Sequence, residues 1–153
     1  MIICNQEKAA SFCLKNKDYW HVIFITSPDE LDNWPLVKHY AKSALLLEFH
    51  DITDKHKDFG IRPEREHIMA AITFAKGVGQ ERLIVCCQAG VSRSSATGYI
   101  ITSLDKDPSE AIKVLDRMLH WPNRKVVELG AELLSNPNIL SEFEKWIGSQ
   151  RLS

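Results

Sequence analysis

The segment Leu83-Ile-Val-Cys-Cys-Gln-Ala-Gly-Val-Ser-Arg-Ser-Ser95 decides the fold that we expect of this chain. Residues 82–86 are mostly apolar and β-branched, which predicts a buried strand. A short loop with Gly90 follows, and residues 94–104 then have a helical pattern. A strand that leads through a tight loop into a helix is typical of α/β proteins, in which ligands bind at the carboxyl ends of the strands.

Strands and helices alternate on the N-terminal side of this segment. Apolar runs predict further strands over residues 1–4, 20–26 and 44–49. Pro63 supplies the fixed φ that suits the first turn of a helix, and Gly77 is expected to end that helix. Residues 51–62 are polar, contain Gly60, and are expected to form a loop.

Only helical patterns follow residue 94, and Asn123 and Asn138 are expected to cap two of these helices. Strands that alternate with helices, followed by helices alone, predict an α/β fold with a central, mostly parallel sheet flanked by helices. No repeat, low-complexity tract or linker interrupts residues 1–153, so we expect a single domain.

The composition is that of a globular protein and excludes several classes of partner. The chain has 153 residues, of which 44% are hydrophobic and 25% charged, with a net charge of −1. No overall charge therefore attracts nucleic acid or an anionic membrane. No apolar run approaches the roughly 20 residues that span a bilayer, and the first residues lack the basic flank of a secretory signal. We expect a cytoplasmic protein without a membrane or nucleic-acid partner.

The cysteines and histidines indicate neither a disulfide framework nor a metal site. The chain has four cysteines, which are Cys4, Cys13, Cys86 and Cys87. They are few and irregularly spaced, and no pair has the Cys-x-x-Cys spacing of metal or redox sites. His50, His56 and His67 lack the spacing of metal ligands. We expect reduced thiols and a function without metal or cofactor, and the sequence carries no signal for an oligomeric state.

The loop after Cys87 combines the groups that bind and attack a phosphate. Five residues separate Cys87 from Arg93, which lets the backbone curl into a ring of N–H donors with Gly90 at a positive φ. The following helix adds the positive end of its dipole, and the guanidinium closes the ring with a bidentate grip on phosphate oxygens. The predicted phosphate-binding residues are Gln88, Ala89, Gly90, Val91, Ser92 and Arg93.

These surroundings favour the thiolate of Cys87 over the thiol, and the thiolate is the nucleophilic form. We expect Cys87 to attack phosphorus and form a thiophosphate intermediate that water hydrolyses. Ser94 can donate a hydrogen bond to the sulfur and help it to leave in the second step. The spacing of cysteine and arginine alone is a weak signal, because a buried core thiol and a surface cation would also fit it. The strand, the glycine, the helix and the hydroxyl together favour the catalytic interpretation.

These residues resemble the signature loop of the protein tyrosine phosphatase superfamily, whose pattern is His-Cys-x5-Arg-Ser/Thr. Within that superfamily the chain is most similar to the small dual-specificity-like members and to a group of short bacterial predicted tyrosine phosphatases. The segments Phe49-His-Asp51-Ile52 and Pro122-Asn-Arg124 match further family features, and the resemblance covers residues 20–134. It implies hydrolysis of a phosphorylated protein or peptide, phosphotyrosine with or without phosphoserine and phosphothreonine.

The general acid is expected on the polar segment after residue 49. A carboxylic acid on a mobile loop can protonate the leaving group, and Asp51, Asp54 and Asp58 are the candidates. Asp51 matches the family position after the third strand, whereas Asp54 matches better the family's usual separation from the cysteine. We favour Asp51, keep Asp54 as the alternative, and interpret Asp58 as a loop carboxylate.

One residue departs from the family pattern, because Cys86 stands where the family has histidine. That histidine orients the loop and stabilises the thiolate in the family, so its absence puts full activity in question. Strand alternation predicts that Cys86 points away from the pocket and is a small buried hydrophobe. A disulfide between Cys86 and an oxidised Cys87 is the less favoured alternative, since vicinal disulfides are strained.

Three functions from different classes fit the sequence. The first is an active phosphatase. The second is a phosphate-binding module that keeps the loop but has lost turnover. The third is another thiol enzyme, such as an arsenate reductase or a sulfurtransferase. Cys87, Arg93 and Ser94 favour the first over the second, and the absence of a further cysteine placed for a reductase relay argues against the third.

Overall fold

The computed structural model describes residues 1–53 and 60–151. Two of the candidate acids, Asp54 and Asp58, lie outside the described residues. In the part of the chain that is described, no helix is long and apolar enough to cross a membrane.

Four strands form one sheet, and all of their pairings are parallel. The strands are β1 (Ile2–Asn5), β2 (His21–Thr26), β3 (Ser43–Glu48) and β4 (Leu83–Cys87), in the spatial order β1-β4-β2-β3. All four lie where the apolar runs predict them. The sequence-based expectation of an α/β fold with a mostly parallel, helix-flanked sheet is confirmed, because parallel neighbours need the helical crossovers that the alternating pattern supplies.

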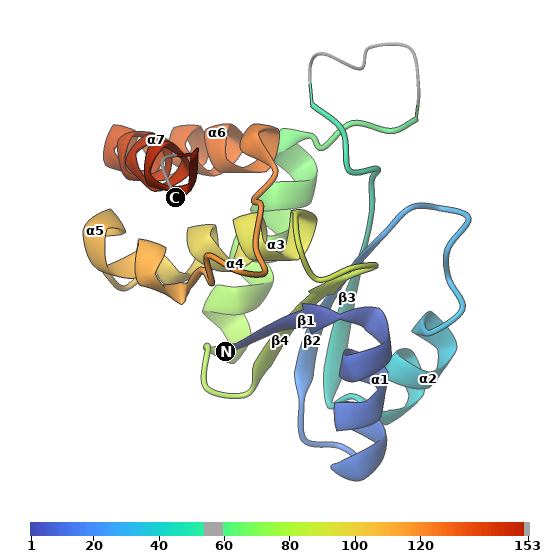
Figure 1. Cartoon of the computed structure of the whole chain (residues 1–153). Coiled ribbons are helices and arrows are strands. Elements are labelled where there is room, and N and C mark those ends of the chain that lie inside the picture. Colours follow the sequence, from blue (N-terminus) through green and yellow to red (C-terminus); the bar gives the residue numbers. More distant parts are fainter. Residues whose placement is uncertain (54–59, 152–153) are drawn as a thin grey trace.

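Helices cover both faces of the sheet, as Figure 1 shows. The helices α1 (Gln6–Lys15) and α2 (Trp34–Tyr40) lie on one face, and α3 (Arg65–Val78) and α4 (Arg93–Thr102) on the other. After the short α5 (Pro108–Ala111) and a 3-10 turn (Ile112–Val114), the helix α6 (Arg124–Leu133) packs on α3 and α4, and α7 (Pro137–Arg151) packs on α6 and α5.

The two faces carry separate hydrophobic clusters. The cluster under α1 and α2 contains Cys4, Val22, Phe24 and Cys86. The larger cluster, under α3, α4, α6 and α7, contains Cys87 among its members. Because side chains alternate along a strand, the two successive cysteines at the end of β4 belong to different cores.

Several helix ends differ from the sequence-based expectation. Pro63 is not in the first turn of α3, because Glu64 is the N-cap and the helix begins at Arg65. Gly77 lies inside α3, which continues to Val78, and Gly79 follows at the C-cap with a φ of +79°. A glycine at a helix end is used where the backbone turns to positive φ, and here that residue is the second of the two glycines. Asn138 does not cap α7, because the helix already begins at Pro137 and the side chain of Asn136 accepts the hydrogen bond from Asn138 N. Asn123 caps α6 as predicted, through Val126 N.

The carboxyl ends of β2, β3 and β4 meet at the same edge of the sheet, because the strands are parallel. Three connecting segments start there: the one after Thr26, the one after Glu48, and the loop after Cys87. Residues far apart in the sequence are therefore brought to one place, and the predicted site lies at this edge.

Candidate active site

The loop of residues 88–93, called the phosphate loop below, turns sharply at Gly90 against the end of β1. Gly90 has a φ of +72°, a conformation that residues with a Cβ adopt at a cost. A Cβ at this position would lie 2.6 Å from Asn5 N and 2.7 Å from the carbonyl carbon of Cys4. The turn therefore needs glycine for two reasons, its dihedral angle and its close contact with β1.

The backbone amides of this loop are available for a ligand. In the described part of the chain, the N–H groups of residues 88–92 donate to no backbone carbonyl. The loop leads directly into α4, which begins at Arg93, so the first N–H groups of that helix also point away from intrahelical partners. Free N–H groups in a tight loop at a helix N-terminus form an anion-binding arrangement.

The sulfur of Cys87 lies against the first turn of α4. Its Sγ is 3.1 Å from the Oγ of Ser94, and the backbone N–H of Ser94 donates to the sulfur at 3.4 Å. Cys87 is 2% exposed and Ser94 is fully buried. When the sulfur is ionised, the hydroxyl of Ser94 can turn to donate to it as well. The structure thus brings together the two side chains that the sequence pairs as nucleophile and helper.

The guanidinium of Arg93 is buried and is held by hydrogen bonds to the segments that follow β2 and β3. Its Nη1 donates to the carbonyl oxygen of Phe49 at 2.8 Å and to the Oγ of Ser27 at 3.3 Å. The residue is only 4% exposed, and its Nε has no partner among the described residues. A buried, charged donor without a partner is costly, so this nitrogen is a candidate ligand-binding atom.

Sequence reasoning missed the contacts that Ser27 and the carbonyl of Phe49 make with Arg93. The signal that identifies them is positional, because each residue directly follows a strand, β2 and β3 respectively. Parallel strands bring these two positions to the edge of the sheet at which β4 ends. A search of the residues that follow each predicted strand would have found both.

Asp51, the favoured acid, is held against the phosphate loop. Its Oδ1 accepts from Ser92 Oγ at 2.7 Å and from Asn123 Nδ2 at 2.8 Å. The same amide group of Asn123 donates to the carbonyl oxygen of Ile52 at 3.1 Å. The side chain of Asp51 is exposed, so one carboxylate oxygen is engaged by the protein while the group as a whole reaches solvent.

The segment that leads into α6 is tied to the same loop. The backbone N–H of Trp121 donates to Val91 O at 3.0 Å, and that of Asn123 donates to Ser92 O at 3.1 Å. Asn123 is 4% exposed and also caps α6. Its side chain therefore joins the start of α6 to Asp51, whereas the sequence predicted only a helix cap at this position.

Cys86 points away from this site, as strand alternation predicts. It is fully buried in the cluster under α1 and α2. Burial raises the pKa of the Cys86 thiol well above its usual value, and the neighbouring cysteines add to that effect. Cys86 is therefore a protonated core residue in this structure.

No group of three or more His, Cys, Asp or Glu side chains in residues 1–53 and 60–151 is arranged to hold a metal ion. The groups that converge at the edge of the sheet are instead a thiol, a guanidinium, hydroxyls, a carboxylate and backbone amides. The chemistry of such a set suits the binding of an anion, with a thiol able to act as nucleophile and a carboxyl group able to donate a proton.

The chain is similar in fold to a solved tyrosine phosphatase, Tk-PTP. A mutant form of Tk-PTP is 15% identical with a TM-score of 0.50, over 99% of this chain and 90% of that chain. The active form of Tk-PTP is 17% identical with a TM-score of 0.47, over 73% of this chain and 72% of that chain. No protein-family model and no curated protein matches the chain. At this identity the likeness shows a tyrosine phosphatase-like fold, and it assigns no function to individual residues.

Proposed function

We propose that this protein is a cysteine-dependent phosphatase that hydrolyses phosphomonoesters, with phosphotyrosine of a protein or peptide as its main substrate. The observation that carries the proposal is the pairing of Cys87 with Arg93. A sulfur lies at the start of a helix, and six residues further along a buried guanidinium has an Nε without a partner in the described part of the chain. A dianionic phosphate is the ligand that satisfies the guanidinium and the free amides together.

The first step joins the sulfur to phosphorus. The Cys87 thiolate attacks, the bond between phosphorus and the leaving oxygen breaks, and Asp51 gives its proton to that oxygen. Ser92 and Asn123 both donate to Oδ1 of Asp51, which leaves Oδ2 to carry the proton. The two donors act as positioning groups that keep the acid beside the phosphate loop.

The second step releases phosphate and restores the enzyme. Water attacks phosphorus, the sulfur–phosphorus bond breaks, and Asp51, now a carboxylate, takes a proton from the water. Ser94 lies 3.1 Å from the sulfur, and its hydroxyl stabilises the departing thiolate by a hydrogen bond. Arg93 and the amides of residues 88–93 hold the phosphoryl oxygens through both steps. No metal or cofactor takes part.

The proposed cellular location rests on the state of the thiols. The free cysteines Cys4, Cys13, Cys86 and Cys87 are all buried, which suits a reducing compartment, so we place the enzyme in the cytoplasm.

The partner of the proposed enzyme is a phosphorylated protein or peptide. Dual specificity, towards phosphoserine and phosphothreonine as well, is part of the same proposal. A phosphate-binding module without turnover is the second candidate, favoured by the single observation that Cys86 replaces the histidine of the family pattern.

The test is phosphate release from a phosphotyrosine peptide with a metal chelator present throughout. The native protein is compared with Cys87→Ser, Asp51→Ala and Asp54→Ala, and with Asp107→Ala as a matched control. Asp107 precedes α5, and its side chain makes no cap hydrogen bond. We expect a loss of about 10³-fold or more in kcat for Cys87→Ser and of about 10²-fold or more for Asp51→Ala.

Each other outcome selects a different conclusion. A loss in Asp54→Ala with a normal Asp51→Ala moves the acid to Asp54. Turnover that persists in Cys87→Ser rejects the covalent mechanism. A native protein that binds inorganic phosphate but hydrolyses no phosphoester supports the binding module instead.

A further inference from the structure

We propose that a hollow beside Asp51 binds an apolar side chain that neighbours the phosphorylated residue of the substrate, and that Trp121 determines this preference. The inference rests on the proposed phosphatase function and adds the substrate class. The hollow has a volume of about 300 Å³. Its lining combines polar residues, among them Asp51, Ser92 and Asn123, with the apolar side chains of Trp121, Phe143 and Ile147.

The position of the hollow indicates which part of a substrate enters it. Ser92 is the one member of the phosphate loop in its lining, and Cys87 and Arg93 are absent from it. The hollow therefore begins where the phosphate loop ends, and its occupant lies beyond the atoms attached to phosphorus. In a peptide substrate, the group that enters the hollow therefore belongs to a residue close to the phosphorylated one. A water molecule takes about 30 Å³ in the liquid, so the hollow has room for a large side chain.

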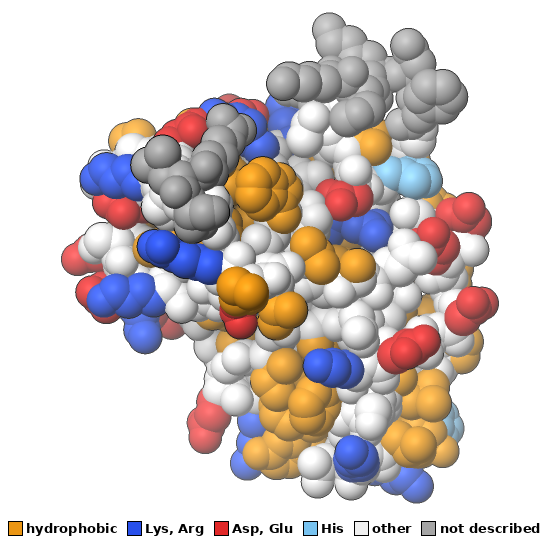
Figure 2. All heavy atoms as spheres, viewed as in Figure 1, with side chains coloured by type: hydrophobic (Ala, Val, Ile, Leu, Met, Phe, Trp, Pro, Cys, Tyr) orange, Lys and Arg blue, Asp and Glu red, His pale blue; other side chains and the backbone are white. Residues whose placement is uncertain are grey.

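Trp121 lines the hollow with an exposed side chain, and a hydrogen bond fixes its backbone. Trp121 is 52% exposed. Its backbone N–H donates a hydrogen bond to Val91 O of the phosphate loop. Two neighbours on the same segment, Met118 and Leu119, are 91% and 63% exposed, and hydrophobic side chains are visible on this part of the surface in Figure 2. Exposed tryptophans with a fixed backbone are common anchors of binding sites.

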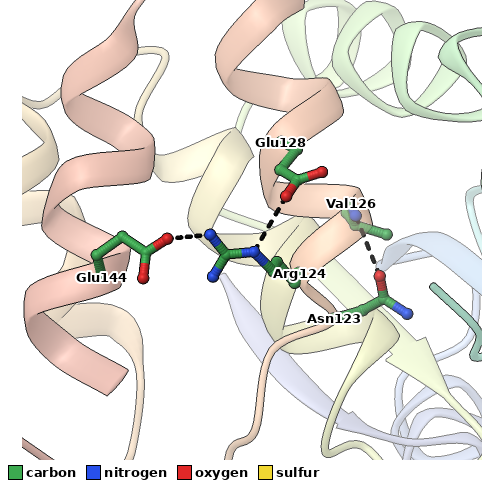
Figure 3. A network of polar contacts seen from close by, with 5 residues as sticks. All are labelled: Asn123, Arg124, Val126, Glu128 and Glu144. Atoms are coloured by element: carbon green, nitrogen blue, oxygen red, sulfur yellow. Dashed lines mark hydrogen bonds and ion pairs between the residues drawn. The ribbon is translucent and has the colours of Figure 1, made fainter. Parts of the chain in front are cut away.

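The charges around the hollow decide between an apolar occupant and a second phosphate. Arg124 lines it, but its guanidinium lies between Glu128 of the same helix and Glu144 of α7, as Figure 3 shows. The Cζ atom of the guanidinium also lies over the ring of Phe143, 5.8 Å from the ring centroid. Two carboxylates thus satisfy the one cation, so Arg124 offers little positive charge to a second phosphate. An apolar group would need to displace only water.

The opposite side of the phosphate loop disfavours acidic peptides. A second hollow of about 360 Å³ adjoins Gln88 and is lined by Glu7, Glu30 and Asp32. Figure 2 shows acidic side chains gathered over the part of this face that carries α1 and the segment before α2. Carboxylates of a substrate would meet like charges there. Acidic neighbours of the phosphotyrosine are therefore disfavoured on this side of the phosphate loop.

The experiment compares three phosphotyrosine peptides that differ only beside the phosphotyrosine, where they carry leucine, serine or aspartate on both sides. For the native protein we expect kcat/KM to be about 10-fold or more higher for the leucine peptide than for the serine peptide. In Trp121→Ala this ratio falls towards one, mainly through KM, and in Trp121→Phe most of it remains. Met118→Ala, on the same exposed segment but outside the hollow, keeps the native ratio.

A binding measurement separates this inference from the proposed function. Fluorescence polarisation gives the dissociation constants of the same labelled peptides for Cys87→Ser, with and without Trp121→Ala. A leucine preference in binding that depends on Trp121 upholds the inference even if the native protein turns nothing over. Turnover without a leucine preference, or with a preference that survives Trp121→Ala, overturns the inference and leaves the phosphatase intact. Equal or absent binding of all three peptides also overturns it.

Discussion

Cys86 and Cys87 are successive residues of β4, yet the structure gives them opposite surroundings. Both are buried, at 0% and 2% exposure, so burial does not distinguish them. Cys86 lies among Cys4, Val22 and Phe24 on the α1 face, whereas the sulfur of Cys87 meets the amide and hydroxyl of Ser94 at the start of α4. The comparison teaches that a candidate nucleophile is identified by the polar groups that meet its sulfur and by the loop that follows it, and not by burial.

Turnover separates the two cysteines most strongly. We expect Cys87→Ser to lower kcat by about 10³-fold or more on a phosphotyrosine peptide, because it removes the proposed nucleophile. Cys86→Ala removes one buried sulfur from the other core and is expected to keep kcat within about 3-fold of the native value. Steady-state kinetics on both variants measures the difference, and comparable losses would mean that the two thiols act as a unit.

Alkylation tests the same difference without a substrate. Burial raises the pKa of the Cys4 thiol to about 12 and that of Cys13 to about 11, and it also raises the pKa of Cys86. Because these pKa values are raised, the thiols stay protonated at pH 8, and about one in 10³ or fewer is the reactive thiolate. We expect iodoacetamide to label Cys87 alone, with inorganic phosphate slowing the reaction.

Mass spectrometry of the labelled peptides gives the site, and the protein unfolded in urea, in which all four cysteines are accessible, is the control. Label on Cys4 or Cys13 of the folded protein at a rate near that of Cys87 would contradict the contrast between the two sides of the sheet.

The phosphate loop, which distinguishes the surroundings of Cys87 from those of Cys86, depends on Gly90. Gly90→Ala places a Cβ 2.6 Å from Asn5 N at a φ of +72°, and we expect a loss of about 2–4 kcal/mol in unfolding free energy together with weaker phosphate binding. Gly77→Ala is the matched change, because Gly77 lies inside α3 with nothing within 4 Å of the added Cβ. It should stabilise the protein by up to about 1 kcal/mol. Urea unfolding of both variants makes the comparison, and a stable Gly90→Ala with native phosphate affinity would show that the turn can be built without glycine.

The smallest expected effect concerns the histidine of the family pattern. Cys86→His would insert an imidazole among the packed side chains of Val22 and Phe24, which are fully buried. We expect a loss of about 1–3 kcal/mol from overpacking and from burying a polar ring, with no gain in kcat. Cys86→Val, which keeps an apolar side chain of similar size, should lose less than about 1.5 kcal/mol. A faster Cys86→His enzyme would instead show that the histidine reaches the phosphate loop from this position.

Much of the fold could be predicted because its signals are local. Apolar runs located the four strands, and the alternation with helices predicted the parallel sheet. The loop from Cys87 to Arg93 was recognisable for the same reason, since strand, turn and helix follow one another within a few residues. The ends of α3 and α7 were wrong by one or two residues, because several glycines and asparagines near a helix end suit a cap and the final packing chooses among them.

The parts of the site that the sequence did not reveal depend on contacts between distant segments. Arg93 is held by Ser27 and by the carbonyl of Phe49, which are 66 and 44 residues away along the chain. Asn123 reaches Asp51 over 72 residues. A backbone carbonyl carries no residue-type signal, and asparagine at a helix start is explained by capping alone. Whether Asp51 or Asp54 is the acid stays a prediction that kinetics has to test.

The side chain of Asn123 uses its oxygen for Val126 N of α6 and its amide nitrogen for Asp51 and the carbonyl of Ile52. Asparagine is among the chemically labile residues of proteins. Deamidation would turn this one into an aspartate, which can still cap α6 but has no N–H to offer Asp51. The helix would keep its cap while a second carboxylate faced the proposed acid. Deamidation of this residue in a stored sample would therefore lower catalysis in molecules that remain folded, and reduced activity with unchanged circular dichroism would be its mark.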